Sequence, residues 1–385
     1  MEKMTIIVSG MVAADPHQGG ATWAVLQYVL GLRGLGHEVV LIEPLTPPKS
    51  APADWDFPAS ESAAYFRRVV AEHHLERHAA LLLAGTRRTV GLSYAELRDI
   101  VKKADLIFNV SGMLADEALL ASIPRRVYLD LDPAFIQIWQ SEYGIDMRLD
   151  AHTHFVTVGQ CIGTKDCPVP TCGRDWIPTA QPVVLEEWPV AKEVERDALT
   201  TIGNWRGYGS VEFQGEHYGQ KAHSLRAFFT LPRCTAEKFA PALAIHPGET
   251  ADLEALAENG WTVLDPAKVA STPEDYRRFI QGSKAEFGIA KSGYVRSRCG
   301  WFSDRSVCYL ASGRPVIAQQ TGFSRWLPAG EGVLAFGTMD EAVAAIESVN
   351  RNYPRQARAA RSIAEEHFDS SKVLPRLLER VGTNL

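Results

Sequence analysis

The sequence lacks several features that would place it in a special class of protein. It has only six cysteines in 385 residues, and their spacing is irregular, which argues against a secreted disulfide framework. No apolar run is long enough to cross a bilayer, and the first residues lack the apolar segment and cleavage site of a signal peptide. We therefore expect a cytoplasmic protein with reduced thiols and no transmembrane segment.

An excess of positive charge is also missing. The chain has 40 Lys and Arg residues against 46 Asp and Glu residues, a formal net charge of -6. Nucleic-acid-binding domains usually present a basic face. We therefore expect no nucleic-acid partner, although single basic pockets for phosphate are compatible with this charge. The sequence leaves open whether the protein is a monomer or a homodimer.

Residue patterns typical of metal sites are weak. Two histidines and three cysteines occur between residues 152 and 172, but none of them forms a CxxC-like pair. Asp130 and Asp132 form an Asp-x-Asp pattern directly before Pro133. That position, at the end of an expected strand, favours a turn over a magnesium site. We expect no bound metal.

What the sequence does contain is an alternation of strands and helices along nearly its whole length. Its 385 residues exceed what one hydrophobic core usually supports, so two domains are expected. Residues 6–8, about 21–34 and 37–44 predict a strand, a helix and a strand in a right-handed βαβ unit. Residues 61–83 are predicted to be helical. A second alternation starts near residue 199 and includes a strand at 261–265.

The expected fold is α/β, with two Rossmann-like doubly wound parallel-sheet domains that face a central cleft. We place the first domain at residues 1–190 and the second at 195–365. Residues 366–385 are expected to form a C-terminal helix that packs back on the first domain. Ligands of such sheets bind at the carboxyl ends of the strands, so the loops there hold the candidate residues.

The loop after the first strand carries Asp15, His17, Gly19 and Gly20. Paired glycines let a backbone approach a ligand closely, and the following helix start adds a partial positive charge. His17 is a candidate general base that Asp15 could orient. A plain glycine turn beside a surface histidine explains the same residues equally well. The turn does not read G-x-G-x-x-G, which argues against an NAD-dependent dehydrogenase.

A second group of candidates lies in the second alternation. Ser303 is the expected N-cap of a helix, so the amides near Phe302, Ser303 and Asp304 could bind a diphosphate. Asp304 could instead accept hydrogen bonds from sugar hydroxyls. A capped helix with nothing bound is the alternative. The full set of donor and diphosphate candidates is Gly19, Gly20, Arg206, Lys221, Phe302, Ser303, Asp304 and Arg305.

Several segments resemble the GT-B glycosyltransferases, in particular the family 4-like group, a type also called glycosyltransferase family 1 proteins. The stretch "GGATWAVLQYVLGLRGLGHEV" resembles the N-terminal pattern of that group, and "YLASGRPVIAQQTGFSRWL" resembles its C-terminal pattern. The EX7E motif of the family aligns its two glutamates with Gly300 and Cys308, neither of which is acidic. Asp304, between them, is the acid that could take over one role.

The resemblance also implies where a nucleotide sugar would bind. Arg206 and Lys221 are the nearest equivalents of the diphosphate-binding residues of the family. The base and ribose would lie near Leu264, Asp265 and Val269. The donor sugar would lie near Lys291, Ser292 and Gly293.

The function expected from this resemblance is hexosyl transfer from a nucleotide diphosphate sugar, with a UDP- or dTDP-sugar favoured, to a small-molecule or saccharide acceptor. The first domain would bind the acceptor and the second the donor. His17, Asp15 and Asp304 are the catalytic candidates, and neither a metal nor a cofactor is expected to be required. The alternatives are a catalytically silent nucleotide-sugar-binding protein and a nucleotide-sugar 2-epimerase.

Overall fold

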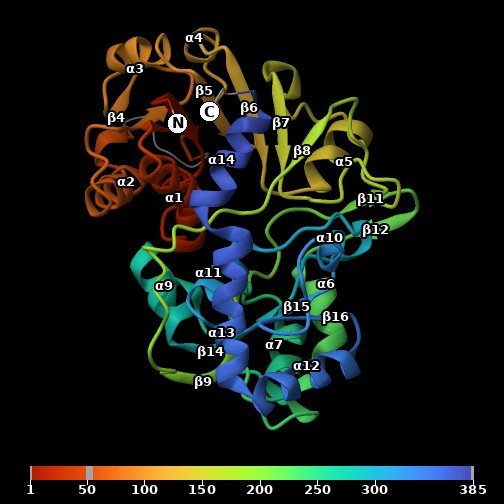
Figure 1. The fold of residues 1–385 in the computed structure, drawn as a ribbon. Coiled ribbons are helices and arrows are strands. Elements are labelled where there is room, and N and C mark those ends of the chain that lie inside the picture. Colours follow the sequence, from red (N-terminus) through yellow and green to blue (C-terminus); the bar gives the residue numbers. More distant parts are fainter. Residues whose placement is uncertain (1, 49–54, 383–385) are drawn as a thin grey trace.

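The computed structural model describes residues 2–48 and 55–382, which form two α/β domains drawn one above the other in Figure 1. The N-terminal domain contains an eight-stranded sheet in the order β4-β3-β2-β1-β5-β6-β7-β8, in which only β4 is antiparallel to its neighbour. Its strands are runs of buried apolar residues, as expected when helices cover both faces of a sheet. They are β1 (Thr5–Ser9), β2 (Glu38–Leu45), β3 (Ala79–Leu83), β4 (Thr89–Gly91), β5 (Leu106–Val110), β6 (Arg125–Asp130), β7 (His154–Thr157) and β8 (Trp176–Pro178).

The helices of this domain begin at recognisable caps. Ser60 accepts a hydrogen bond from the amide of Ala63 at the start of α2, and Ser93 forms a capping box with Glu96 at the start of α3. These helices are α1 (Gly19–Gly34), α2 (Glu61–Glu72), α3 (Tyr94–Val101), α4 (Glu117–Leu120) and α5 (Phe135–Glu142). The prediction of one helix over residues 61–83 is wrong, because α2 ends at Glu72 and residues 79–83 form the buried strand β3.

The C-terminal domain is built on a four-stranded parallel sheet in the order β16-β15-β14-β9. Two smaller sheets of two strands each accompany it, the parallel pair β10–β13 and the antiparallel hairpin β11–β12. The strand predicted at 261–265 forms only isolated bridges, from Trp261 to Phe239 and from Leu264 to Ala242. The strands are β9 (Arg196–Thr200), β10 (Ile202–Asn204), β11 (Val211–Phe213), β12 (Glu216–Tyr218), β13 (Ala242–Ala244), β14 (Ser283–Gly288), β15 (Val316–Gln319) and β16 (Val333–Phe336).

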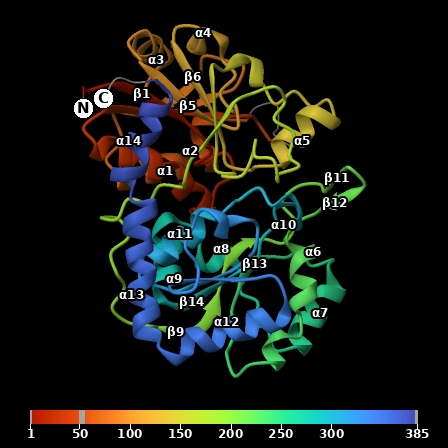
Figure 2. The same cartoon turned by 45° about the vertical axis from the view of Figure 1, so that its right-hand side comes forward.

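The last helices of the chain return from the second domain to the first, as Figure 2 shows for α13 and α14. Helix α14 packs on α1, where a Cβ added to Gly31 would lie 2.6 Å from Leu374 Cδ1. The segment before α14 pairs with Val183, whose amide donates to Phe368 O at 2.8 Å. The helices of this half are α6 (Lys221–Leu225), α7 (Thr250–Glu258), α8 (Pro266–Val269), α9 (Pro273–Gly282), α10 (Ser292–Ser297), α11 (Asp304–Ala311), α12 (Met339–Arg351), α13 (Tyr353–Ile363) and α14 (Ser370–Arg380).

The two domains are joined where the start of α1 meets residues 270–276. Three donors of the N-terminal domain bind three carbonyl oxygens of this segment: Gly19 N–H to Ala270 O at 3.0 Å, Tyr65 OH to Ser271 O at 3.2 Å and Trp23 Nε1–H to Pro273 O at 2.8 Å. We call these three bonds the interdomain clamp. Gly19 and Gly20, in the first turn of α1, pack directly against residues 270–276. An added Cβ on Gly19 would overlap Thr272 O, and one on Gly20 would lie 2.8 Å from the Tyr276 ring.

No helix in the described part of the chain combines the length and the apolar character that a membrane crossing requires.

The clamp predicts opposite effects for two glycine substitutions in α1. Gly19→Ala should lower the free energy of unfolding by about 1–3 kcal/mol, because the new methyl group overlaps a backbone carbonyl that must shift. Gly34→Ala, at the exposed end of the same helix, meets nothing within 4 Å and should be neutral or stabilising. Urea denaturation of both variants measures the difference, and equal stabilities would contradict the clamp.

Candidate active site

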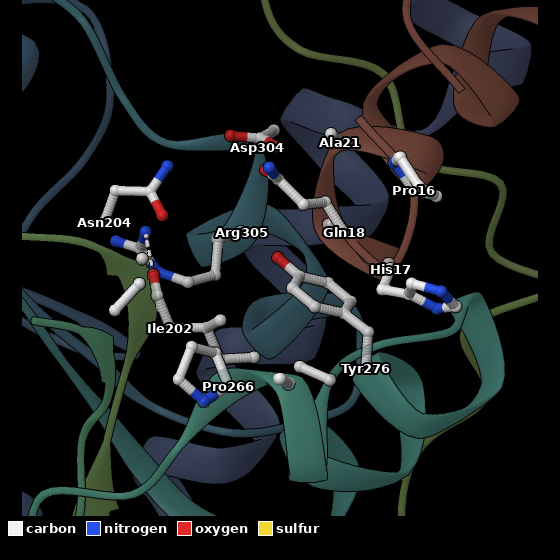
Figure 3. Close-up of a pocket in the computed structure, with 16 residues that line it drawn as sticks. Pro16, His17, Gln18, Ala21, Ile202, Asn204, Pro266, Tyr276, Asp304 and Arg305 are labelled. Atoms are coloured by element: carbon white, nitrogen blue, oxygen red, sulfur yellow. Dashed lines mark hydrogen bonds between the residues drawn. The ribbon is translucent and has the colours of Figure 1, made fainter. Parts of the chain in front are cut away.

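A cavity of about 370 Å³ lies between the domains, next to the interdomain clamp. The N-terminal domain contributes one wall through residues 16–21, the end of the β1–α1 loop and the first turn of α1. The C-terminal domain contributes the other walls from five separate segments (Figure 3). Those residues are Ile202, Gly203, Asn204, Ala244, Pro266, Ala267, Ala270, Tyr276, Asp304 and Arg305.

Arg305 is the cation of this cavity, and a buried acid holds it in place. Its Nε donates to Glu286 Oε1 at 2.6 Å, and its Nη1 donates to Ile202 O at 2.9 Å. Glu286 is completely buried on β14, and its Oε2 has no hydrogen-bond partner among the described residues. Burying a carboxylate is costly unless a counter-charge such as this one, or several hydrogen bonds, compensates it. The pair therefore fixes the guanidinium at the cavity wall.

Lys221 lies behind the same wall. A Cβ on Gly203 would be 3.1 Å from Lys221 Cε and 3.9 Å from Arg305 Nη1, so the absence of a side chain there lets both cations approach β10. Lys221 Nζ donates to Ile289 O at 2.8 Å. Burial, followed by the nearby charge of Arg305, lowers the pKa of Lys221 well below its usual value.

The start of α11 lies where the sequence predicts it, with Ser303 at the N-cap and Asp304 in the first turn. Asp304 lines the cavity, and burial raises the pKa of its carboxyl group. Ser303 is buried, and its hydroxyl contacts Asp304 Oδ1 at 3.4 Å. The Phe302 ring does not line this cavity but stacks on Phe368 in the core.

Arg206 is not part of the cavity wall. Its guanidinium pairs with Glu249, with Nη2 3.3 Å from Oε2, and the side chain is exposed. The hairpin β11–β12 separates it in sequence from Lys221, which explains the wide spacing between these two residues. Arg305, and not Arg206, is the arginine that lines this cavity.

His17 lies at the edge of the cavity, on the side away from Asn204 and Arg305 in Figure 3. Its Nε2 lies 2.8 Å from Glu61 Oε1, and its ring packs edge-on against Tyr65. Asp15 accepts a hydrogen bond from the Gln18 side chain instead. The prediction that Asp15 orients His17 therefore needs correction, because the carboxylate beside the imidazole belongs to Glu61.

The segment expected to bind the base borders the cavity through different residues. Pro266, Ala267 and Ala270 face the cavity, whereas Leu264 and Val269 pack against the core. Asp265 caps α8 by accepting a hydrogen bond from the amide of Ala267 at 3.0 Å.

The residues expected at the donor sugar form a separate contact between the domains. Lys291 Nζ lies 3.0 Å from Asp132 Oδ2 and 4.0 Å from the centre of the Tyr208 ring. Ser292 accepts a hydrogen bond from the Gly219 amide at 2.9 Å. Gly293 leaves room for Phe135, whose Cζ would lie 2.6 Å from an added Cβ. None of the three borders the cavity beside Arg305.

The backbone explains one departure from the EX7E motif. Gly300 has φ +79°, and a Cβ there would lie 2.7 Å from Cys161 Sγ, so this position cannot hold a glutamate without rearrangement. Cys308 is buried beside Gln27 of α1. Both positions therefore support the domain contact.

Sequence reasoning missed five polar residues of this region, namely Gln18, Glu61, Asn204, Tyr276 and Glu286. Glu286 had a visible signal, since it is the single acid of β14 and is followed by the buried residues Phe287 and Gly288. Glu61 had none, because it lies 44 residues from its partner His17.

The comparisons with known proteins agree with this architecture. Residues 250–378 match a family model described as glycosyl transferase-like. An alpha-glucosyltransferase in complex with UDP-glucose and DNA superposes with a TM-score of 0.62 at 12% identity, covering 99% of this chain and 100% of the other. The chain has the GT-B fold. The GT-B protein HepE from Anabaena, in complex with UDP-glucose, gives a TM-score of 0.58 at 11% identity and covers 98% of this chain and 99% of its own.

A glycosyltransferase from Rickettsia africae gives a TM-score of 0.54 at 11% identity, covering 99% of this GT-B chain and 98% of its own. No curated protein matches the sequence. The matches do not separate the family 4-like group from other GT-B families.

One expectation about partners is wrong. The low positive charge led us to expect no nucleic-acid partner, but four of the matched alpha-glucosyltransferase structures contain DNA and align with 99–100% of this chain. Net charge alone therefore cannot exclude nucleic acid as a partner of this GT-B protein, because binding depends on the local surface.

The Arg305–Glu286 pair predicts a stability effect that a second substitution should repair. Arg305→Met should lower the free energy of unfolding by about 3–5 kcal/mol, because it leaves Glu286 charged and buried without the guanidinium that balances its charge. Adding Glu286→Gln should restore most of that loss. Urea denaturation of the wild type, both single variants and the double variant measures the coupling, and additive effects would contradict it.

Proposed function

We propose that the protein transfers a hexosyl group from a nucleotide diphosphate sugar, with UDP or dTDP as the favoured nucleotide, to an acceptor held by the N-terminal domain. The observation that carries this proposal is the convergence of Arg305, Asn204 and the N-terminus of α11 on one interdomain cavity. A guanidinium, an amide and a helix N-terminus suit a diphosphate. The UDP and UDP-glucose complexes of the matched structures support the same choice of donor.

The proposed chemistry follows from the position of these charges. Loss of the diphosphate leaves an oxocarbenium-like sugar, and negative charge develops on the leaving group. Arg305, with Lys221 behind it, would stabilise that charge electrostatically. The side chains of Asn204 and Asp304 would orient the donor. This assignment requires no metal and no cofactor, so we expect EDTA to leave the rate unchanged.

His17 is the proposed group for the acceptor step. It lies on the N-terminal side of the cavity, and Glu61 holds its imidazole at 2.8 Å. A histidine oriented by a carboxylate can accept the proton of an attacking hydroxyl group. We propose that Glu61 orients the His17 imidazole.

We also propose that the reaction occurs in the cytoplasm, where the six unpaired cysteines would stay reduced.

Nucleic acid is the acceptor candidate that the comparisons favour beside a saccharide or small molecule. The supporting observation is that matched structures hold 13-mer DNA containing an HMU base together with UDP. Incubation with UDP-[14C]glucose and either a 13-mer duplex containing HMU or a saccharide panel separates these acceptors. Label on the duplex identifies nucleic acid, and label on a saccharide alone removes that candidate.

Two other functions share the cavity and are distinguished by product. A silent binding protein would bind the nucleotide sugar and transfer label to no acceptor. A 2-epimerase would alter the donor or release free nucleotide when no acceptor is present.

The donor proposal predicts a selective thermal shift. UDP, dTDP, GDP, ADP and NAD are tested in parallel, and UDP or dTDP at about 100 times its Kd should add about 2.7 kcal/mol of stability. The variant carrying both Arg305→Met and Glu286→Gln should fold but lose this shift. If no nucleotide shifts the wild type, the proposed donor is wrong. If the double variant keeps the full shift, the role of Arg305 is wrong.

The acceptor step predicts a loss of turnover in His17→Ala. With any acceptor that becomes labelled, kcat should fall by about 10²–10⁴-fold, the usual contribution of a general base, and Glu61→Gln should give a smaller fall. Asp15→Asn is the matched control in the same loop and should leave kcat near the wild-type value. Full turnover in His17→Ala would show that the imidazole has no catalytic role.

A further inference from the structure

A second buried carboxylate, Glu43, lies on β2 next to the loop that forms the N-terminal wall of the cavity. The side chain is completely buried. Its Oε1 accepts hydrogen bonds from the amides of Val12, Ala13 and Ala14 at 2.8, 2.7 and 2.7 Å, and its Oε2 accepts a second one from Ala13 at 2.9 Å. Three consecutive backbone N–H groups therefore point at one carboxylate.

Glu43 differs from an ordinary buried acid in how its charge is compensated. Glu286 has Arg305 beside it, whereas the interactions that act on Glu43 are burial, which raises its pKa to about 7, and the three loop amides, which oppose that rise. A carboxylate that accepts several amide hydrogen bonds is stabilised as the anion. The Glu43 carboxylate can therefore keep these hydrogen bonds only while the backbone of residues 12–14 keeps its present conformation.

The same loop reaches the cavity within a few residues. Pro16, His17 and Gln18 line it, and His17 has a left-handed backbone with φ +66°. Val12 is held on its other side by the Thr22 hydroxyl, which donates to Val12 O at 3.2 Å. A loop with so little regular structure depends on such fixed points for its shape.

We propose that Glu43 is a positioning residue, whose carboxylate fixes residues 12–14 and thereby holds Pro16, His17 and Gln18 against the bound nucleotide. The loop-fixing part stands on these contacts alone, and the nucleotide part rests on the proposed function. Glu43 touches no ligand in this assignment. It acts through the backbone of the β1–α1 loop, and it explains why an acid is present inside an apolar strand.

Two measurements on Glu43→Gln test the proposal, with Glu38→Gln as the control. Glu38 lies on the same strand, but its partly exposed carboxylate pairs with Lys3 and His78. The first measurement is amide hydrogen exchange of the protein without ligand. Glu43→Gln should speed exchange at least tenfold at the amides of Val12, Ala13 and Ala14, with β14 unchanged, because the substitution removes the negative charge that these amides bind and turns one acceptor oxygen into an NH₂ donor that faces the Ala13 N–H. The second measurement is UDP titration, in which Kd should rise about tenfold.

The outcomes separate this inference from the proposed function. Faster exchange without any UDP binding by the wild type keeps the loop role and overturns UDP as the donor nucleotide. Unchanged exchange at the amides of Val12, Ala13 and Ala14, or an unchanged Kd in a variant that binds UDP, overturns the positioning role. If Glu43→Gln does not fold, exchange of the wild type decides: strong protection of the Val12, Ala13 and Ala14 amides is required, and rapid exchange there contradicts the proposal.

Discussion

The contact between the first turn of α1 and residues 270–276 is the constraint on which the rest of the molecule depends. Gly19 and Gly20 have no side chains, so the backbone of one domain can lie directly on the carbonyl groups and the Tyr276 ring of the other. The same turn also lines the cavity. A side chain at either position would separate the domains and open the cavity together, because one structural element forms both.

The cavity therefore exists only in a particular arrangement of two domains. The clamp fixes one part of the interface, and Asp132 with Lys291 and the surrounding aromatic rings fixes another. Loops 161–167 and 297–300 close the region near Gly300, where Cys161 N–H donates to Cys299 O at 2.8 Å. Rigid packing on several sides means that Arg305 and His17, which come from different domains, have a defined separation even without a ligand.

Local signals in the sequence predicted local structure well. The strand at Ile6–Val8 follows from an apolar run, and the start of α9 after Thr272 follows from capping chemistry, and both signals involve near neighbours. The importance of the glycine pair was also predictable, but its reason was not, since Tyr276 lies more than 250 positions away. The helix predicted for residues 61–83 failed for the same reason. A short apolar run such as 79–83 fits a helix or a buried strand equally, and only its pairing with β2 decides.

Glu43 and Glu286 show what sequence reading can gain from buried acids. Each lies on a strand whose other residues are mostly buried and apolar, a position where an uncompensated charge costs several kcal/mol, on the order of the stability of a whole domain. Each must therefore have a partner that the fold provides. Glu286 pairs with Arg305 and so keeps a positive charge at the cavity wall. Glu43 accepts hydrogen bonds from backbone amides and so fixes the conformation of the β1–α1 loop. The type of group that compensates the buried charge, a cation or backbone amides, therefore indicates whether the acid positions a charged side chain or a loop.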